Sequence, residues 1–339
     1  MPQPAIELRN LGRRFGERWV IRHMNLDVPE GLVCGLLGRR GVGKTTTLRT
    51  IFGLLQPHEG EVRVKGLDPL RDRAAVVRAM GYAGEEPSPD PSWTVERVLA
   101  FSSWVYGDWD SDRAEALRRR FALPLDRPVG ELTAASRSSL VLIVALVRRP
   151  KVLLLDEPFE TVDDVVRRET VEGLIDVLPR AGSTVLLSSH RINDLERIVG
   201  RLAILRGGKI VFNGSVEKLR DSVRRVRVVS NDGALDPREL PWVRNADRLG
   251  RGWCVSVVDF TEDRLDVLKT AGFSIEAVEK PGLEQIAFEY LEDDHEEGLS
   301  LAAGCETTFA PPSRTANRPS RIHRLTPGFL RGRGARSLQ

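Results

Sequence analysis

One eight-residue segment constrains this chain more than any other. Residues 38–45 read GRRGVGKT and match the pattern G-x-x-x-x-G-K-[ST], and Thr46 follows directly. The apolar stretch 31–37 before this segment predicts a buried strand, and residues 47–51 after it predict the first turns of a helix. In such a setting glycines let backbone N–H groups turn inward, and the helix N-terminus adds positive potential. The segment therefore predicts a site for the phosphates of a nucleoside triphosphate.

Individual side chains of this segment have expected roles. Lys44 is expected to reach the outer phosphates, and the Thr45 hydroxyl is expected to be a ligand of Mg²⁺. The residues expected to bind the nucleotide here are Gly38, Arg39, Arg40, Gly41, Val42, Gly43, Lys44, Thr45 and Thr46.

The charge and cysteine content exclude several classes of protein. The formal net charge of the 339 residues is +3, but residues 311–339 hold arginines and no acid, so the rest of the chain is mildly acidic. This distribution argues against a nucleic-acid-binding core. The three cysteines form no C-x-x-C pair, so neither a disulfide framework nor a zinc site is indicated. No apolar run approaches the roughly 20 residues that cross a bilayer, and the first residues have no apolar signal region, so we expect a cytoplasmic protein.

Strands alternating with helices predict an α/β fold with a doubly wound sheet. We expect a nucleotide-binding domain over 1–220 with a helical lobe at about 86–149, a small α+β domain over 222–292 and a disordered basic tail over 298–339. Thr94 is expected to cap a helix. The other expected elements are a hairpin turn at 15–19, helices at 112–121, 164–178, 262–271 and 281–292, and strands at 151–155, 185–188, 225–229 and 253–258.

Two adjacent carboxylates end one of the predicted strands. Four apolar residues, 152–155, precede Asp156 and Glu157. A buried strand would deliver Asp156 toward Mg²⁺ and Glu157 toward an attacking water. Such a pair most often marks a solvent-exposed strand end, but the phosphate-binding pattern earlier in the chain makes that interpretation less favoured here.

The order of these motifs resembles the ATP-binding subunit of an ABC transporter, over roughly residues 5–220. The resemblance implies a P-loop NTPase with a RecA-like core, an antiparallel β subdomain and an inserted helical lobe. It also implies that Phe15 stacks on adenine, that Glu85 is a magnesium ligand in the Q-loop position, and that His190 contacts the γ-phosphate. The signature segment, which would bind the nucleotide of a second subunit, is Thr133, Ala134, Ala135 and Ser136.

The signature segment departs from the LSGGQ pattern of the family. Thr133 keeps a hydroxyl, but Ala134 and Ala135 replace glycines, and an alanine costs about 1 kcal/mol or more wherever a glycine needs a positive φ. If both composite sites of a homodimer use this segment, hydrolysis would be slow. In a heterodimer, Lys44 and Glu157 of this chain could face a normal signature on the partner.

The resemblance implies an ATPase subunit with ATP and Mg²⁺ as cofactors, in which Glu157, His190 and Lys44 are the catalytic residues. It implies membrane permease subunits and a second ATPase subunit as partners, with the chain peripheral on the inner face of the cell membrane. The last predicted helix resembles that of drug- and antibiotic-exporter ATPases, so we expect an exporter. Two alternatives stay open: a catalytically weak ATP-binding regulatory subunit of a heterodimer, and a soluble ABC ATPase without a transport role.

Overall fold

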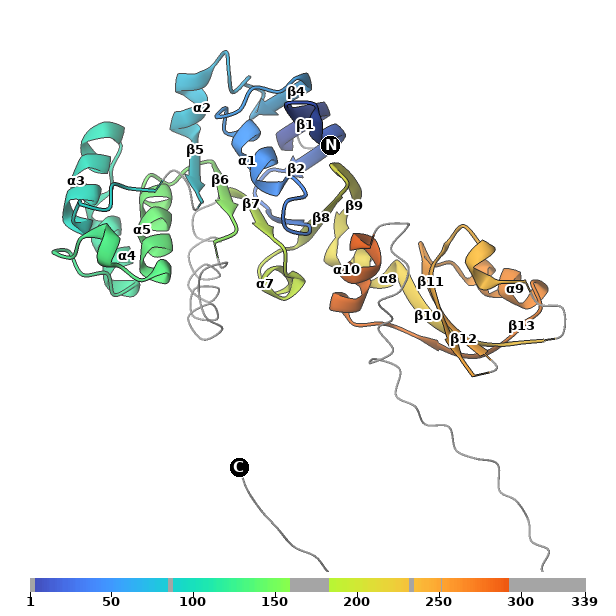
Figure 1. The fold of residues 1–339 in the computed structure, drawn as a ribbon. Coiled ribbons are helices and arrows are strands. Elements are labelled where there is room, and N and C mark those ends of the chain that lie inside the picture. Colours follow the sequence, from blue (N-terminus) through green and yellow to red (C-terminus); the bar gives the residue numbers. More distant parts are fainter. Residues whose placement is uncertain (1–3, 85–87, 159–182, 232–234, 251, 293–339) are drawn as a thin grey trace, which may run out of the picture. The chain divides into compact units, whose positions relative to one another are not determined.

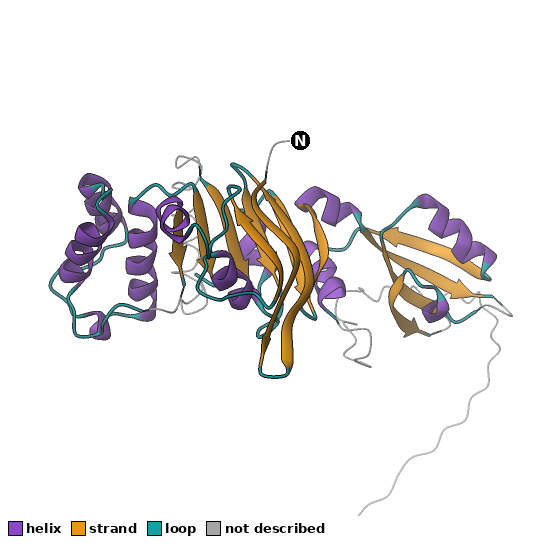
Figure 2. Ribbon diagram, turned by 90° about the horizontal axis from the view of Figure 1, so that it is seen from above, coloured by secondary structure: helices purple, strands orange, loops and turns teal. Residues whose placement is uncertain are grey.

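The computed structural model describes residues 4–84, 88–158, 183–231, 235–250 and 252–292. Within them the chain folds into three sheets with helices between and beside them (Figures 1 and 2). The expected α/β fold is confirmed. None of the described helices is long and apolar enough to cross a membrane.

A six-stranded sheet carries the glycine-rich segment. Its strand order is β5–β6–β7–β3–β8–β9, with the first five strands parallel and the last antiparallel. The strands are β3 (Val33–Leu37), β5 (Met80–Ala83), β6 (Val152–Asp156), β7 (Thr184–Ser189), β8 (Arg201–Arg206) and β9 (Lys209–Ser215). Parallel strands are usually covered on both faces, and β6 and β7 are buried along their whole length. Their carboxyl ends meet at one edge of the sheet, where the glycine-rich segment follows β3 and Glu157 follows β6.

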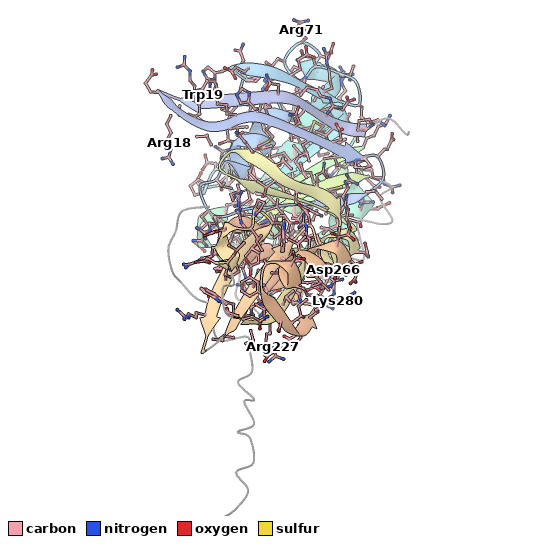
Figure 3. The ribbon with its side chains drawn as sticks, turned by 90° about the vertical axis from the view of Figure 1, so that its right-hand side faces the viewer. Arg18, Trp19, Arg71, Arg227, Asp266 and Lys280 are labelled. Atoms are coloured by element: carbon pink, nitrogen blue, oxygen red, sulfur yellow. The ribbon has the colours of Figure 1, made fainter. Side chains whose placement is uncertain are left out.

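An antiparallel sheet of order β2–β1–β4 packs against this region. Its strands are β1 (Pro4–Phe15), β2 (Arg18–Pro29) and β4 (Glu59–Val64), and the neighbouring helices are α1 (Lys44–Ile51) and α2 (Arg73–Ala79). Fully buried side chains such as Ile6, Leu36 and Leu48 form one core that joins the two sheets through α1. The expected turn between β1 and β2 is confirmed, and Figure 3 shows Arg18 and Trp19 near the turn end of this hairpin.

Three helices lie together in the predicted helical lobe (Figure 1). They are α3 (Val95–Tyr106), α4 (Ser111–Arg120) and α5 (Ala134–Val147), with a short 3₁₀ turn, η1 (Val129–Glu131), before α5. The Thr94 hydroxyl accepts a hydrogen bond from the Arg97 N–H at 3.2 Å, which confirms the predicted cap.

The C-terminal part holds a four-stranded antiparallel sheet of order β11–β12–β10–β13. Its strands are β10 (Val223–Ser230), β11 (Val243–Leu249), β12 (Gly252–Val258) and β13 (Phe273–Glu279). The helices of this part and of the segment before it are α7 (Ile192–Glu196), α8 (Val216–Asp221), η2 (Pro237–Glu239), α9 (Glu262–Thr270) and α10 (Leu283–Leu291). The predicted strands and helices at β10, β12, α9 and α10 are present, whereas β11 and β13 had not been predicted.

Helix α10 contacts both the C-terminal sheet and the larger core. Leu283 and Ile286 belong to the same buried cluster as Leu202 of β8. On another side, the buried Glu289 carboxylate accepts a hydrogen bond from the Ser256 hydroxyl of β12 at 2.5 Å. This helix therefore ties the sheet of residues 223–279 to the nucleotide-binding core. The predicted helix at 164–178 and the predicted tail at 298–339 lie outside the described residues.

Candidate nucleotide site

The glycine-rich segment leads directly from β3 into α1. The helix begins at Lys44, three residues earlier than predicted, because Gly43 at φ 113° and ψ 11° serves as its N-cap. A left-handed conformation costs a residue with a Cβ about 1–2 kcal/mol, which accounts for glycine at this position. The segment borders a cavity of about 370 Å³ lined by Val20, Arg40, Gly41, Gly43, Lys44, Thr45, Thr46 and Glu157.

The Lys44 ammonium group is held at the base of this cavity and is 5% exposed. It donates to the carbonyl oxygens of Gly38 at 2.8 Å and Arg39 at 2.9 Å, and it lies 2.9 Å from Glu157 Oε1. An ammonium group has three N–H donors, so these three oxygens match its capacity. Lys44 is therefore a buried, oriented cation whose position fits a phosphate oxygen in place of the carboxylate.

Glu157, one of the residues with an expected catalytic role, contacts both His190 and Lys44. His190 Nδ1 lies 3.0 Å from Glu157 Oε2, and the His190 backbone N–H donates to the same oxygen at 3.3 Å. Glu157 has a φ of 48°, which an L-residue rarely adopts and which commonly marks a functional site. The Glu157 carboxylate thus links a lysine and a histidine from two other segments of the chain.

The neighbouring carboxylate, Asp156, is 5% exposed and is held by hydroxyl groups. Thr45 and Ser188 donate to Oδ1 at 3.1 and 2.9 Å, and Tyr82 donates to Oδ2 at 3.0 Å. The Ser188 hydroxyl also accepts the Glu157 N–H at 3.0 Å, so one side chain orients both acids. Burial and the Asp156 charge raise the pKa of the Tyr82 phenol, which therefore stays a donor at neutral pH.

The oxygen atoms of Thr45 and Asp156 fit the requirements of Mg²⁺. They come from a hydroxyl and a carboxylate and lie 3.1 Å apart, and Thr45 lines the cavity that also holds Lys44. Mg²⁺ prefers oxygen ligands and is usually held by one or two protein groups together with phosphate oxygens. The side chains present can therefore hold a magnesium nucleotide. Glu85, the other predicted metal ligand, lies outside the described residues.

The signature segment is not part of this cavity. Thr133 is the N-cap of α5, where its side chain accepts the Ser136 N–H at 3.1 Å. Ala134 and Ala135 form the first helical turn, so they adopt the helical region rather than the positive φ that would have made alanine costly. The signature segment is well formed, and the alanines differ from glycines only by two Cβ atoms on its surface.

The other residues predicted to contact the nucleotide lie either in the glycine-rich loop or at the end of β1. Gly38, Arg39 and Val42 lie in the loop but do not line the cavity, and the two arginines of the loop are exposed. Phe15 lies at the end of β1, is 49% exposed, and has the Arg13 guanidinium 4.9 Å from its ring centre. Its role as an adenine platform stays a prediction.

Three residues of the site had not been predicted. Val20 lines the phosphate cavity, and Tyr82 and Ser188 hold Asp156. Ser188 could have been found, because it stands at the carboxyl end of a buried strand next to Ser189 and His190. Val20 and Tyr82 are ordinary strand residues by pattern, and only the packing of the two sheets reveals their positions.

Known proteins resemble this chain in sequence and in fold. The sequence profile of the ABC transporter family matches residues 21–160. The chain is 34% identical over 230 residues to the Nod factor export ATP-binding protein I of Burkholderia lata, covering 66% of this chain and 74% of that protein. It is also 34% identical over 229 residues to the osmoprotectant import ATP-binding protein OsmV of Salmonella typhimurium, covering 63% and 59%. A solved ATP-binding subunit of an ABC transporter shares the fold, with a TM-score of 0.59 at 24% identity over 64% of this chain and 92% of that one.

Proposed function

The chain belongs to the ABC transporter family as an ATP-binding subunit with ATPase activity, and we propose that it powers a separate membrane permease. The observation that carries the proposal is that Glu157, which lines the phosphate cavity beside Lys44, contacts both Lys44 and His190. A catalytically weak regulatory subunit would not need Glu157 in contact with both Lys44 and His190. The proposal therefore includes hydrolysis by this chain's own site.

The residues of the cavity have complementary tasks in hydrolysis. Glu157 would orient a water molecule toward the γ-phosphate and accept its proton, because its second oxygen is already fixed by His190. Lys44 would offset the charge that develops on the phosphate oxygens. Thr45 and Asp156 would hold Mg²⁺, which would supply positive charge to the bound phosphates. His190 would keep Glu157 oriented and contact the γ-phosphate.

A second surface of the chain suits a permease. A cavity of about 440 Å³, here called the aromatic groove, runs between the end of α1 and β5 on one side and α3 and α5 on the other. Its aromatic lining residues are Phe52, Tyr82, Trp93, Phe101 and Tyr106. Phe101 is 48% exposed, and Trp104, whose ring centre lies 6.1 Å from that of Phe101, is 80% exposed. Exposed apolar surface of this kind commonly marks a protein interface.

Affinity purification of the tagged chain from detergent-solubilised membranes of its native cells tests this partner. We expect a membrane protein with several spanning segments to copurify. We expect Phe101→Ser to lose it, while Leu235→Ser, which removes a comparably exposed side chain in the C-terminal part, retains it. Absence of any membrane protein would contradict the transport role, and retention by Phe101→Ser would contradict docking at the aromatic groove.

A second ATPase subunit would complete the site. The signature segment 133–136 lies apart from the chain's own phosphate cavity, as expected of a segment that serves the nucleotide on a partner. In a homodimer the two Cβ atoms of Ala134 and Ala135 would approach the partner's nucleotide and slow turnover. We expect the double change to glycine to raise the turnover of the purified chain several-fold if it works as a homodimer. Unchanged turnover would contradict this explanation and favour a partner with a normal signature.

We further propose that the complex exports its substrate and that the chain lies on the cytoplasmic face of the membrane. The proposal rests on the resemblance of residues 283–290 to the C-terminal helix of drug- and antibiotic-exporter ATPases. In proteoliposomes, ATP added outside serves only complexes whose ATPase faces outward, so an exporter would accumulate substrate in the lumen. Release of preloaded substrate under the same conditions would indicate import instead.

A further inference from the structure

Tyr82 holds the oxygen of Asp156 that the other hydroxyls leave free. Thr45 and Ser188 both donate to Oδ1, whereas the Tyr82 phenol donates to Oδ2 at 3.0 Å. A carboxylate fixed through one oxygen can still rotate about its Cβ–Cγ bond. With both oxygens held, its plane and its free lone pairs are determined.

The ring of Tyr82 belongs to a different surface from its hydroxyl. The ring lines the aromatic groove and packs against Phe52, with ring centres 5.4 Å apart and planes tilted by 40°. The phenol oxygen also fills the space beside Gly84, since a Cβ built there would lie 2.7 Å from it. Tyr82 therefore has its ring in the groove and its hydroxyl on the carboxylate of the nucleotide site.

We propose that Tyr82 is a positioning residue that sets the orientation of Asp156 toward magnesium nucleotide and links the aromatic groove to that carboxylate. A change in the packing of the groove moves the Tyr82 ring, and the hydroxyl then shifts relative to Oδ2. The link to a permease rests on the proposed function, because the groove is a docking surface only if a permease occupies it. The link between groove and carboxylate is a property of the chain alone and can be measured without the partner.

Equilibrium titration with a fluorescent ATP analogue tests the positioning role without reference to turnover. Binding is measured with excess Mg²⁺ and with EDTA for the wild type, for Tyr82→Phe and for Tyr106→Phe. The last variant loses the same atom from another tyrosine of the groove. We expect Tyr82→Phe to weaken binding of the magnesium nucleotide about tenfold, the effect of one hydrogen bond to a charged group, and to leave metal-free binding unchanged. Tyr106→Phe should bind like the wild type in both conditions.

The results separate this inference from the proposed function. Equal magnesium-dependent binding by Tyr82→Phe and the wild type would overturn the positioning role. An equal loss of nucleotide affinity with and without Mg²⁺ would also overturn it, because the substitution would then have disturbed the structure in general. A wild-type chain that binds no magnesium nucleotide would contradict the proposed function itself.

A double-mutant cycle with Phe52 tests the link from the groove. Phe52→Leu removes the aromatic partner of the Tyr82 ring and keeps an apolar side chain at the end of α1. We expect it to weaken magnesium-dependent binding a few-fold in the wild-type background and to have no further effect in Tyr82→Phe. Fully additive losses would show that Phe52 acts by another route, and would overturn the link.

Discussion

Replacement of Glu157 by glutamine should tighten ATP binding, although it removes a catalytic group. In the structure, the three donors of the Lys44 ammonium are taken by the carbonyl oxygens of Gly38 and Arg39 and by Glu157 Oε1. A phosphate oxygen must take the place of one of them. The carbonyl oxygens belong to the loop that binds the phosphates, so the Glu157 carboxylate is the partner that leaves.

The magnitude follows from the contact that is lost. A hydrogen bond between charged groups contributes about 1.5–3 kcal/mol, and both side chains are largely buried, at 4% and 14% exposed, so solvent screens the pair little. Since 1.4 kcal/mol corresponds to a factor of ten, the competing carboxylate weakens ATP binding by about 10- to 100-fold. Glu157→Gln should lower the Kd by that factor. It should also reduce the free energy of unfolding without nucleotide by about 3 kcal/mol, because Lys44 loses its counterion.

Titration with a fluorescent ATP analogue, together with thermal unfolding with and without magnesium nucleotide, measures both effects. Glu289→Gln is the matched control, because it removes a buried carboxylate in the C-terminal part, away from the cavity. We expect its Kd to equal that of the wild type. An unchanged or higher Kd for Glu157→Gln would refute the competition for Lys44.

Other substitutions and conditions test separate parts of the structure. Gly43→Ala should lower the free energy of unfolding by about 1–2 kcal/mol in urea titrations and weaken nucleotide binding, because its φ is 113° and its Cβ would crowd the neighbouring β2 strand. Glycine at both Ala134 and Ala135 should lower the same free energy by about 1–2 kcal/mol, because glycine is unfavourable in a helical turn. Burial raises the pKa of the Glu289 carboxyl group, so the stabilisation from its protonated form is lost as the pH rises from about 4.5 through the folded-state pKa. The melting temperature of Glu289→Gln should therefore increase relative to that of the wild type between pH 5 and pH 8. Burial also raises the pKa of the Cys34 thiol to about 11, so at pH 8 mass spectrometry should find Cys34 labelled by thiol reagents only after unfolding.

The parts of the fold that could be predicted are those where a local pattern has one physical solution. A buried apolar run that ends in Asp156 and Glu157 has to be a central strand, and Thr94 before an apolar helical pattern is a cap. The start of α1 was predicted three residues late, because Thr45 and Thr46 have low helix propensity and the glycine cap that starts the helix is visible only in the backbone angles. Strand β11 was missed because polar residues interrupt its apolar pattern.

The candidate site could be predicted where a motif carries its own chemistry. Lys44, Glu157 and His190 were selected from their motifs, and the structure links them through the Glu157 carboxylate. The hydroxyl of Tyr82 could not be placed, because its partner is 74 residues away and a tyrosine in a strand has no distinctive pattern. The conformation of Ala134 could not be predicted from the sequence either, since alanine fits both a strained loop and a helical turn.

The most direct test of the central claim is steady-state phosphate release from magnesium ATP by the purified chain beside its Glu157→Gln variant. We expect the wild type to turn over and the variant to lose turnover while it still binds the nucleotide. Equal turnover by both proteins would show that the cavity lined by Lys44 and Glu157 is not where the reaction occurs.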